Sequence, residues 1–290
     1  MSQVAVDRLI ELLDLEAIEV NIFRGLSPDV DRQRVFGGQV AGQALVAAAR
    51  TVEPDRPVHS LHAYFLRPGD PAVPILYEVD RIRDGRSFTT RRVVAIQHGK
   101  AIFNLAASFQ VAEEGLDHQI PLEDTMFDGT PPPPPESLPD WRTRMAPWKD
   151  KLGTWYDRPR PIDHRNVDFE PQDRHESLPP PQRTWLRAAG VLPDDPVLHT
   201  CVLTYASDLT VLDTSVLPHG LGTMDDRLQM VSLDHAMWFH RPFRADEWLL
   251  YVQDTPSALL FHGTAPAVIY THDGHLAVSV VQEGLIRIRG

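Results

Sequence analysis

The sequence predicts an α+β protein in which one structural plan is used twice. A nearly charge-free helix at 37–50 precedes several long apolar strands, and the second half of the chain repeats this order. Two landmarks of the repeat agree in register. The segment YFLRP at 64–68 matches WFHRP at 238–242 at an offset of 174 residues, and the turn at 98–99 matches that at 273–274 at an offset of 175. A chance match of a short Arg-Pro pair is the alternative explanation.

The elements of the first half follow from apolar spacing and turn residues. Apolar residues at helical spacing with acids between them predict a helix at Val6–Ile18. Gly37–Arg50 is rich in Ala and small on every side, which predicts a helix enclosed by other elements. Runs of Val, Ile, Phe and Tyr between Asp-Gly and His-Gly turns predict antiparallel strands at Ile75–Ile82, Thr89–Gln97 and Ala101–Gln110.

The second half predicts the same kinds of element in the same order. A helix is expected at Leu198–Leu212, followed by strands at Leu228–His240, Trp248–Asp254, Ala258–Tyr270 and Leu276–Arg289. A length of 290 residues also fits two domains. We therefore expect an N-terminal unit at 1–112 and a C-terminal unit at 197–290.

Residues 113–196 are expected to link the two units. Many of the 26 prolines gather here, including the runs 131–135 and 179–181. Proline lacks a backbone donor and resists helix and central strand, so the segment reads as a stiff connector. Four tryptophans indicate that it packs on the globule; they are Trp141, Trp148, Trp155 and Trp185.

Composition excludes several classes of protein. The net charge of −12 argues against a nucleic-acid partner, because phosphate backbones bind basic surfaces. Cys201 is the single cysteine, so a disulfide framework or a Cys-based zinc site within one chain is excluded. The N-terminus carries acids through its apolar stretch, unlike a signal peptide, and no apolar run is long enough to span a membrane. A cytoplasmic protein is the expectation.

Common catalytic motifs are absent from the sequence. There is no GxSxG, Walker A, GxGxxG or HExxH motif. His59 and His62 lie in a segment that looks like a strand, where a spacing of three puts side chains on opposite faces, so they are read as ordinary polar positions rather than metal ligands.

Three polar residues interrupt apolar segments. Asp208 lies on an otherwise apolar helix, Ser232 is near the start of a strand and Gln282 ends another. Buried polar groups need partners, so they would satisfy one another or hold a water if they met. Each alone could also be a capped or solvent-facing residue, and the sequence does not decide between these readings.

At these residues the chain resembles the type II acyl-CoA thioesterases, the bacterial thioesterase II family. The resemblance covers nearly the whole chain and includes RQRVFGGQVAGQAL (32–45), HSLHAYFLRPGD (59–70), RDGRSFTTRRVVAIQHGKAIF (83–103), TYASD (204–208), LDHAMWFHRPFRADEWLLY (233–251) and VQEGLIR (281–287). It implies a double hot-dog fold, in which each of two tandem units wraps a curved antiparallel sheet round one long helix. It also implies hydrolysis of medium- or long-chain fatty acyl-CoA to free fatty acid and CoA, with no metal, no other cofactor and no covalent intermediate.

The resemblance carries a catalytic trio onto Asp208, Ser232 and Gln282. Asp208 would act as general base on a water that Ser232 and Gln282 hold. The family typically has threonine where this chain has Ser232, which keeps the hydroxyl. A backbone N–H at the start of the first long helix, at Gly37 or Gly38, is the expected donor to the developing oxyanion.

The chain departs from the family where two arginines are expected before the last hairpin. His262 and Pro266 stand there instead, and neither offers the bidentate phosphate contacts of arginine. A proline also lacks the ladder donor, so this strand is expected at an edge or bulged. Arg86, Arg91 and Arg92 remain as candidate contacts to the CoA phosphates, with solvated strand charges as the equal alternative.

Two other functions are alternatives to a thioesterase. A hot-dog hydratase would need an Asp/His pair, and the spacing of Asp213 and His219 after Asp208 gives it no support. A non-catalytic acyl-CoA- or lipid-binding protein is opposed by the trio and favoured by the missing arginines. Because hot-dog sheets have long edges, a homodimer or homotetramer is expected.

Overall fold

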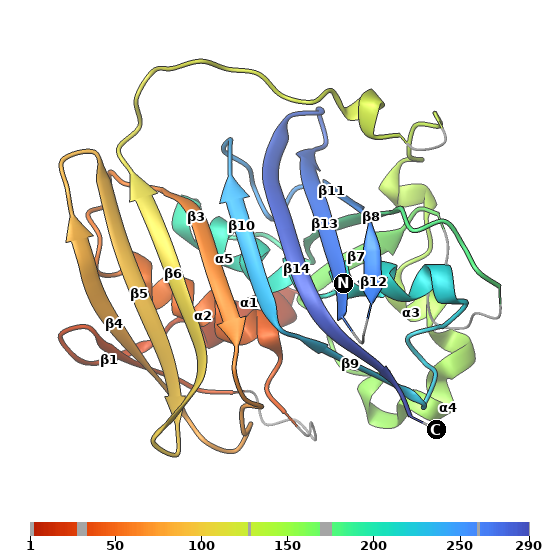
Figure 1. Cartoon of the computed structure of the whole chain (residues 1–290), viewed down its shortest axis with the longest axis horizontal. Coiled ribbons are helices and arrows are strands. Elements are labelled where there is room, and N and C mark those ends of the chain that lie inside the picture. The colour runs from red at the N-terminus through yellow and green to blue at the C-terminus, as the bar shows by residue number, and fades with distance from the viewer. Residues whose placement is uncertain (1–2, 28–33, 127–128, 169–175, 260–261, 290) are drawn as a thin grey trace.

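A computed structural model describes residues 3–27, 34–126, 129–168, 176–259 and 262–289. These residues form one antiparallel sheet of 14 strands, in the order β1-β2-β4-β5-β6-β3-β10-β14-β13-β11-β8-β7, with β9 and β12 as side branches on β14 and β13. Figure 1 shows the helices α2 and α5 behind this sheet, and β3 beside β10 where the two halves of the chain meet.

The bounds of the elements are close to those expected for most of the sheet. The helices are α1 (Gln3–Leu13), α2 (Gly37–Ala49), α3 (Trp141–Arg144), α4 (Lys149–Leu152) and α5 (Pro196–Ser207). The strands are β1 (Glu16–Glu19), β2 (Ile22–Gly25), β3 (Val58–Phe65), β4 (Ile75–Asp84), β5 (Phe88–Gln97), β6 (Lys100–Gln110), β7 (Ile162–Asn166), β8 (Gln182–Ala188), β9 (Leu228–Ser232), β10 (Asp234–Phe239), β11 (Leu249–Gln253), β12 (Ser257–Leu259), β13 (His262–Thr271) and β14 (Leu276–Ile288).

The two long central helices are enclosed, as the small residues of 37–50 predicted. Every residue of α2 from Gly38 to Ala48 is buried, and α2 packs against α5 and against the strands of its own half. Close approach requires glycine here: a Cβ on Gly38 would lie 2.3 Å from the carbonyl oxygen of Tyr205, and one on Gly42 would lie 3.2 Å from that of Cys201. The first residues of α2 therefore rest directly on the last turn of α5.

Four expected elements have different bounds. The helix expected at 6–18 ends at Leu13, and the chain turns into β1. The helix expected at 198–212 ends at Ser207, and a 3-10 helix follows at Val211–His219. The strand expected at 228–240 is divided at Leu233 into β9 and β10. The strand expected at 258–270 is a hairpin of β12 and β13, and its residues 260–261 lie outside the described residues.

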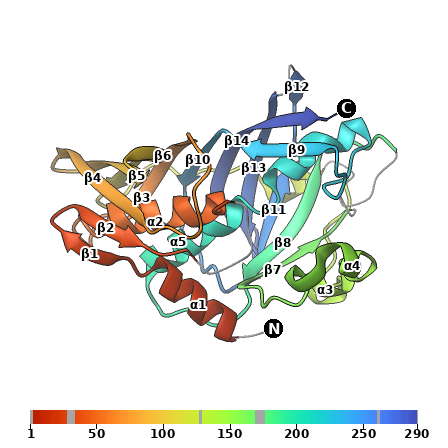
Figure 2. The same ribbon diagram turned by 90° about the horizontal axis from the view of Figure 1, so that it is seen from below.

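The Pro-rich segment 113–196 does more than connect. It crosses from β6 to the other half (Figure 1) and supplies β7 and β8, and β8 extends the sheet through its pairing with β11. Its prolines also accept bonds from the core: the indole N–H of Trp185 donates to the carbonyl of Pro133 over 3.0 Å. Figure 2 shows α3 and α4 beside β7 at the end of the molecule far from β4.

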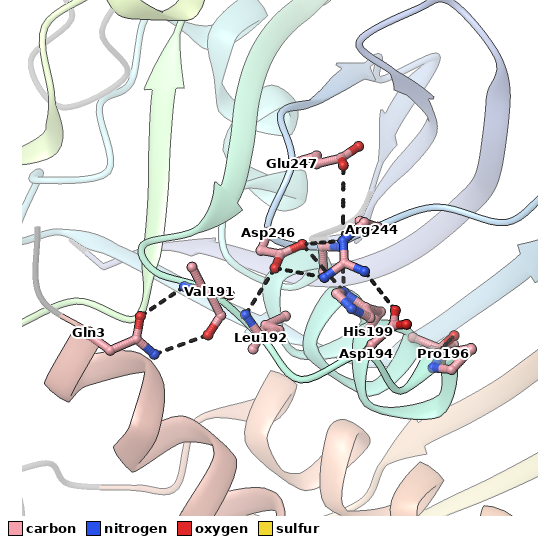
Figure 3. Close-up of polar contacts among 11 residues, drawn as sticks. Gln3, Val191, Leu192, Asp194, Pro196, His199, Arg244, Asp246 and Glu247 are labelled. Atoms are coloured by element: carbon pink, nitrogen blue, oxygen red, sulfur yellow. Dashed lines mark hydrogen bonds and ion pairs between the residues drawn. The ribbon is translucent and has the colours of Figure 1, made fainter.

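A polar cluster fixes the start of α5 (Figure 3). The Asp195 carboxylate caps the helix by accepting the N–H of Val197 over 2.9 Å. Arg244 lies between Asp194 (2.8 Å) and Asp246 (3.0 Å), and His199 accepts the N–H of Ala245 over 2.9 Å. Because α5 is held at this end, the residue after its last turn, Asp208, has a defined position.

No helix among the described residues is long and apolar enough to cross a membrane.

Candidate active site

The structure brings Asp208, Ser232 and Gln282 together from three elements. Asp208 directly follows α5, Ser232 ends β9 and Gln282 lies within β14. The Gln282 Nε2 atom is 2.9 Å from Asp208 Oδ1 and 2.6 Å from Ser232 Oγ, and the Ser232 hydroxyl is 3.2 Å from the same carboxylate oxygen. A carboxylate only accepts hydrogen bonds, so the amide nitrogen of Gln282 faces it and both amide hydrogens are engaged.

A shift of one residue between the two ladders on β14 makes this meeting possible. Ser232 of β9 pairs with Gly284, whereas Ala236 of β10 pairs with Val281, so one extra residue lies between them. Side chains alternate faces along a strand, so residues 232 and 235 would normally face opposite sides of the sheet. The extra residue between them brings both side chains to the same face. Gln282 therefore receives side chains from both β9 and β10.

Asp208 and Ser232 open onto a cavity of about 1040 Å³. Its wall is part apolar and part polar: Val40, Phe65, Ile102, Phe103, Leu212, Met230 and Val231 lie on it beside Arg34, Arg67, Asp213 and Gln229. A second cavity of about 960 Å³ shares Val35, Phe36 and Leu209 with it. Gln282 is fully buried behind the wall, so it can reach a ligand only through Ser232 or Asp208.

The start of α2 closes over Asp208. A Cβ on Gly37 would lie 2.7 Å from Asp208 Oδ2 and 2.8 Å from the Phe65 ring, so only glycine fits. Gly37 lines the cavity, whereas the backbone N–H of Gly38 is directed to the Asp208 carboxylate and lowers the pKa of that group. The two glycines, expected together as oxyanion donors, thus have different surroundings.

Burial dominates the electrostatics of both carboxyl groups at this wall. It raises the pKa of Asp208 above its ordinary value, although the neighbouring imidazole of His235 and the bonds from Gln282, Ser232 and Gly38 oppose it. Burial also raises the pKa of Asp213 to about 7, against the nearby charge of Arg144. A raised pKa makes a carboxylate a stronger base near neutral pH.

A histidine that the sequence reasoning missed lies behind the trio. His235 of β10 is fully buried, and its Nδ1 is 2.5 Å from the Oε1 atom of Gln282. Its Nε2 is 2.8 Å from the hydroxyl of Ser207, the last residue of α5. The signal was available in LDHAMWF, where His235 alternates with the buried Met237 on one face of a strand.

The three arginines expected to contact CoA lie away from the cavity. Phe65 of the cavity wall is level with Phe103 and Ala95. Arg91 and Arg92 lie nearer the start of β5, and Arg86 precedes that strand in the turn from β4. For Arg91 the expectation is wrong for a second reason: its side chain is 1% exposed, and its five donors are used within the protein. Arg92 is exposed and donates to Asp80 over 3.0 Å.

The cavity wall instead carries Arg34, Arg67 and Arg289, which are exposed. Arg34 donates to the carbonyl of Met230 over 3.1 Å and Arg67 to that of Ala101 over 2.6 Å. Arg67 belongs to the first Arg-Pro pair of the repeat and Arg34 precedes the glycine pair, so both stood in motifs whose cationic residue the sequence reasoning did not use.

The two residues that replace the family arginines, His262 and Pro266, both lie on β13. His262 is exposed, with its Nδ1 3.8 Å from a Glu283 oxygen. The expectation of an edge or a bulge at Pro266 is wrong, because β13 is central and Pro266 pairs with Val281 without a shift. Pro266 is tolerated because the pairing with β11 ends at Ala267 and the pairing with β12 at Thr264, so its missing N–H falls between two ladders.

His59 and His62 do not form a site with each other. His59 bonds the hydroxyl of Ser108 over 2.8 Å, and His62 packs edge-on against Trp238. Among the described residues, no group of three or more His, Cys, Asp or Glu side chains is arranged to hold a metal ion.

Comparison with known proteins places this chain in a family. The profile of the acyl-CoA thioesterase family matches residues 163–285, and that of the acyl-CoA thioesterase N-terminal domain matches 26–110. Human acyl-coenzyme A thioesterase 8 is 41% identical over 291 residues, which cover 96% of this chain and 88% of the relative.

Solved structures agree in fold. The acyl-CoA thioesterase II TesB2 from Mycobacterium marinum superposes with a TM-score of 0.78 at 45% identity, covering 97% of this chain and 99% of that one. A protein described as having a hot-dog fold, from Alicyclobacillus acidocaldarius, superposes with a TM-score of 0.74 at 16% identity over 98% of this chain and 99% of that one. The expected fold is confirmed, and the chain belongs to the type II acyl-CoA thioesterase family, with two tandem hot-dog units.

Proposed function

We propose that this thioesterase hydrolyses medium- or long-chain fatty acyl-CoA to free fatty acid and CoA, with a water molecule activated by Asp208. One observation carries the proposal: three polar side chains from three elements are bonded to one another at the wall of a large cavity that also has apolar residues. Burying polar groups costs free energy unless they are hydrogen-bonded, and these three bond one another while Asp208 and Ser232 remain open to the cavity.

In this mechanism Asp208 removes a proton from water. Its raised pKa supports this role, because a general base works best when its pKa approaches the working pH. Ser232 orients the water directly, and Gln282 holds it indirectly, since its two amide hydrogens already fix Ser232 and Asp208 Oδ1. Asp208 Oδ2, on the side of Gly37, is then the atom that accepts the proton.

The water oxygen attacks the thioester carbonyl carbon, and the carbonyl oxygen becomes an oxyanion. Gly37 is the proposed donor to it, because the first N–H groups of a helix have no partner within the helix and Gly37 lines the cavity. Collapse of the tetrahedral intermediate breaks the carbon–sulfur bond. The thiolate of CoA leaves and is protonated by the proton that Asp208 took from water.

The cavity supports the choice of substrate. The apolar part of its wall suits a fatty acyl chain, and the exposed Arg34 and Arg67 suit the phosphates of CoA, which arginine binds with paired donors. These two residues take the role first expected of Arg86, Arg91 and Arg92.

The test is CoA release from palmitoyl-CoA, followed with a thiol reagent. Asp208→Asn should lower kcat by about 100-fold or more, the range of a lost general base, with an unchanged thermal unfolding midpoint. Asp80→Asn, on an exposed carboxylate paired with Arg92, is the matched control and should keep full activity. Full activity in Asp208→Asn would remove the proposed base, and a substrate series from C4 to C18 would give the preferred chain length.

Assembly and location are proposed on general grounds. Strands β1 and β7 are the two ends of the described sheet path, and unpaired strand edges favour pairing with another chain. We propose a homodimer or homotetramer in the cytoplasm.

A further inference from the structure

We infer that His235 is a positioning residue, which fixes the Gln282 carboxamide so that its two hydrogens face Asp208 and Ser232. The inference rests on the proposed function of that trio. It assigns a role to a buried side chain that does not itself touch the cavity.

Strand register makes His235 and Gln282 direct partners. Ala236 pairs with Val281, so the preceding residue of β10 lies opposite the following residue of β14. Opposite residues of an antiparallel pair project on the same face, here toward the end of α5. The two side chains are both fully buried and 2.5 Å apart at their polar atoms.

The bonds on Gln282 fix the tautomer of His235. Because the amide nitrogen donates to Asp208 and Ser232, the amide oxygen must be the atom that faces His235. That oxygen only accepts, so Nδ1 carries a hydrogen. Burial lowers the pKa of His235, against the charges of Asp208 and Asp234, so the ring is neutral and its Nε2 faces the Ser207 hydroxyl, which is also 3.0 Å from the Thr204 carbonyl oxygen.

The result is a chain of donors that points one way. His235 donates to Gln282, and Gln282 donates to Asp208 and Ser232. Hydrogen bonds in such a chain polarise and strengthen one another. The terminal torsion of a glutamine is soft, so a donor on its oxygen side is what restrains the amide plane. Without the bond from His235, the Gln282 carboxamide could rotate, and Asp208 and Ser232 would lose the hydrogen bonds that it donates to them.

Two polar substitutions separate positioning from mere filling of space. Asn places its amide nitrogen on Cγ, where Nδ1 stands in histidine, whereas Gln places it one atom further, where Nε2 stands. His235→Asn should therefore keep kcat within about threefold, and His235→Gln should lower kcat by about 10- to 100-fold with little change in KM, the scale expected of a misplaced catalytic group. His62→Gln, on the exposed face of the neighbouring strand, is the control and should leave kcat unchanged.

The pH profile gives a readout that a structural role would not move. The bond from Gln282 lowers the pKa of Asp208, so loosening it raises that pKa and shifts the acid limb of kcat to higher pH. The titratable groups facing His235 are Asp208, Asp234 and, through the Ser207 carbonyl, Tyr251. The shift should occur in His235→Gln and be absent in His235→Asn.

Each outcome decides the inference. Equal kcat values and equal acid limbs in the two variants would overturn it, whether both stay active or both lose activity. An inactive Asp208→Asn beside a fully active His235→Gln would overturn this inference alone, while an active Asp208→Asn would overturn the proposed function beneath it.

Discussion

Two carboxyl groups share the cavity wall, and their surroundings differ. Asp208 is bonded by Gln282 and Ser232, which partly offset the cost of its burial. Asp213 faces the nearby charge of Arg144, and burial raises its pKa to about 7. The bonds allow the first to remain a charged base, whereas the second is close to half-protonated at neutral pH.

Asp213→Asn should stabilise the protein more at pH 8 than at pH 5. The folded-state pKa of Asp213 lies above the unfolded value near 4, so the cost of its charge is absent below pH 4, grows up to pH 7 and is constant above. The amide carries no such cost. We expect a gain on the order of 1–3 kcal/mol at pH 8, measured by urea unfolding at both pH values; an equal gain at both would contradict the assigned pKa.

For single residues, the sequence predicts which positions belong to the site better than it predicts what each residue does there. Asp208, Ser232 and Gln282 could be singled out because each interrupts an apolar segment, and they do meet. Their convergence could not be derived, because it depends on a register shift between distant strands. The alternation of His235 with Met237 pointed to a buried histidine, but the apolar Trp238 on the other face left open which face of the strand is enclosed.

Among the elements, β4 and β5 show how a charge can hold a sheet to a helix. Arg91 of β5 donates to the hydroxyl and the carbonyl of Thr51, just after α2, and to the Asp84 carboxylate at the end of β4. The Arg91 guanidinium therefore links the hairpin of β4 and β5 to the end of α2.

Arg91→Met should destabilise the protein by about 2 kcal/mol or more, because it leaves buried acceptors without a donor. The KM for acyl-CoA should not change in the folded enzyme. Arg92→Met, next in sequence but exposed on the sheet surface, is the control and should alter neither value. Unfolding in guanidinium chloride and steady-state kinetics would check this. A raised KM in Arg91→Met would contradict the prediction and support a contact between Arg91 and the CoA phosphates.

The bounds of an element could be predicted where a single apolar periodicity runs through it. They could not be predicted where a strand changes its pairing partner. The helix at 37–50 and the strands between 75 and 110 agree within a few residues. β9 and β10 look like one apolar strand in sequence, yet β10 also pairs with β3 while β9 does not. β7 and β8 were hidden because flanking prolines suggested a connector, although β8 itself has none.

For the whole molecule, the pairing of β3 with β10 joins the two hot-dog units into one sheet. The repeat seen at 64–68 and 238–242 continues these same strands, so the sequence landmarks mark the seam between the units. The side chains proposed for catalysis, Asp208, Ser232 and Gln282, come from the second unit, while the first supplies Gly37, Gly38 and Phe65 around them.

We predict a dimer or tetramer in sedimentation experiments at micromolar concentration. The ends of the described sheet, β1 and β7, carry backbone groups that another chain can pair. Every residue of β1 is exposed, so a proline at Ala17 tests that edge without touching the core. A monomer at all concentrations would contradict the prediction, and assembly unchanged by Ala17→Pro would exclude β1 as the interface.

The extra residue at Leu233 lets two side chains three residues apart share one glutamine. In a regular strand Ser232 and His235 would lie on opposite faces, yet both contact Gln282. Removing Leu233 would leave one continuous ladder on β14, with Ser232 still opposite Gly284 and two residues before His235, so both would still face Gln282. The enzyme should thus tolerate the loss of this apolar residue, as it should an exchange of serine for threonine at 232, whereas a slip of β9 by one residue against β14 would turn Ser232 away from Gln282.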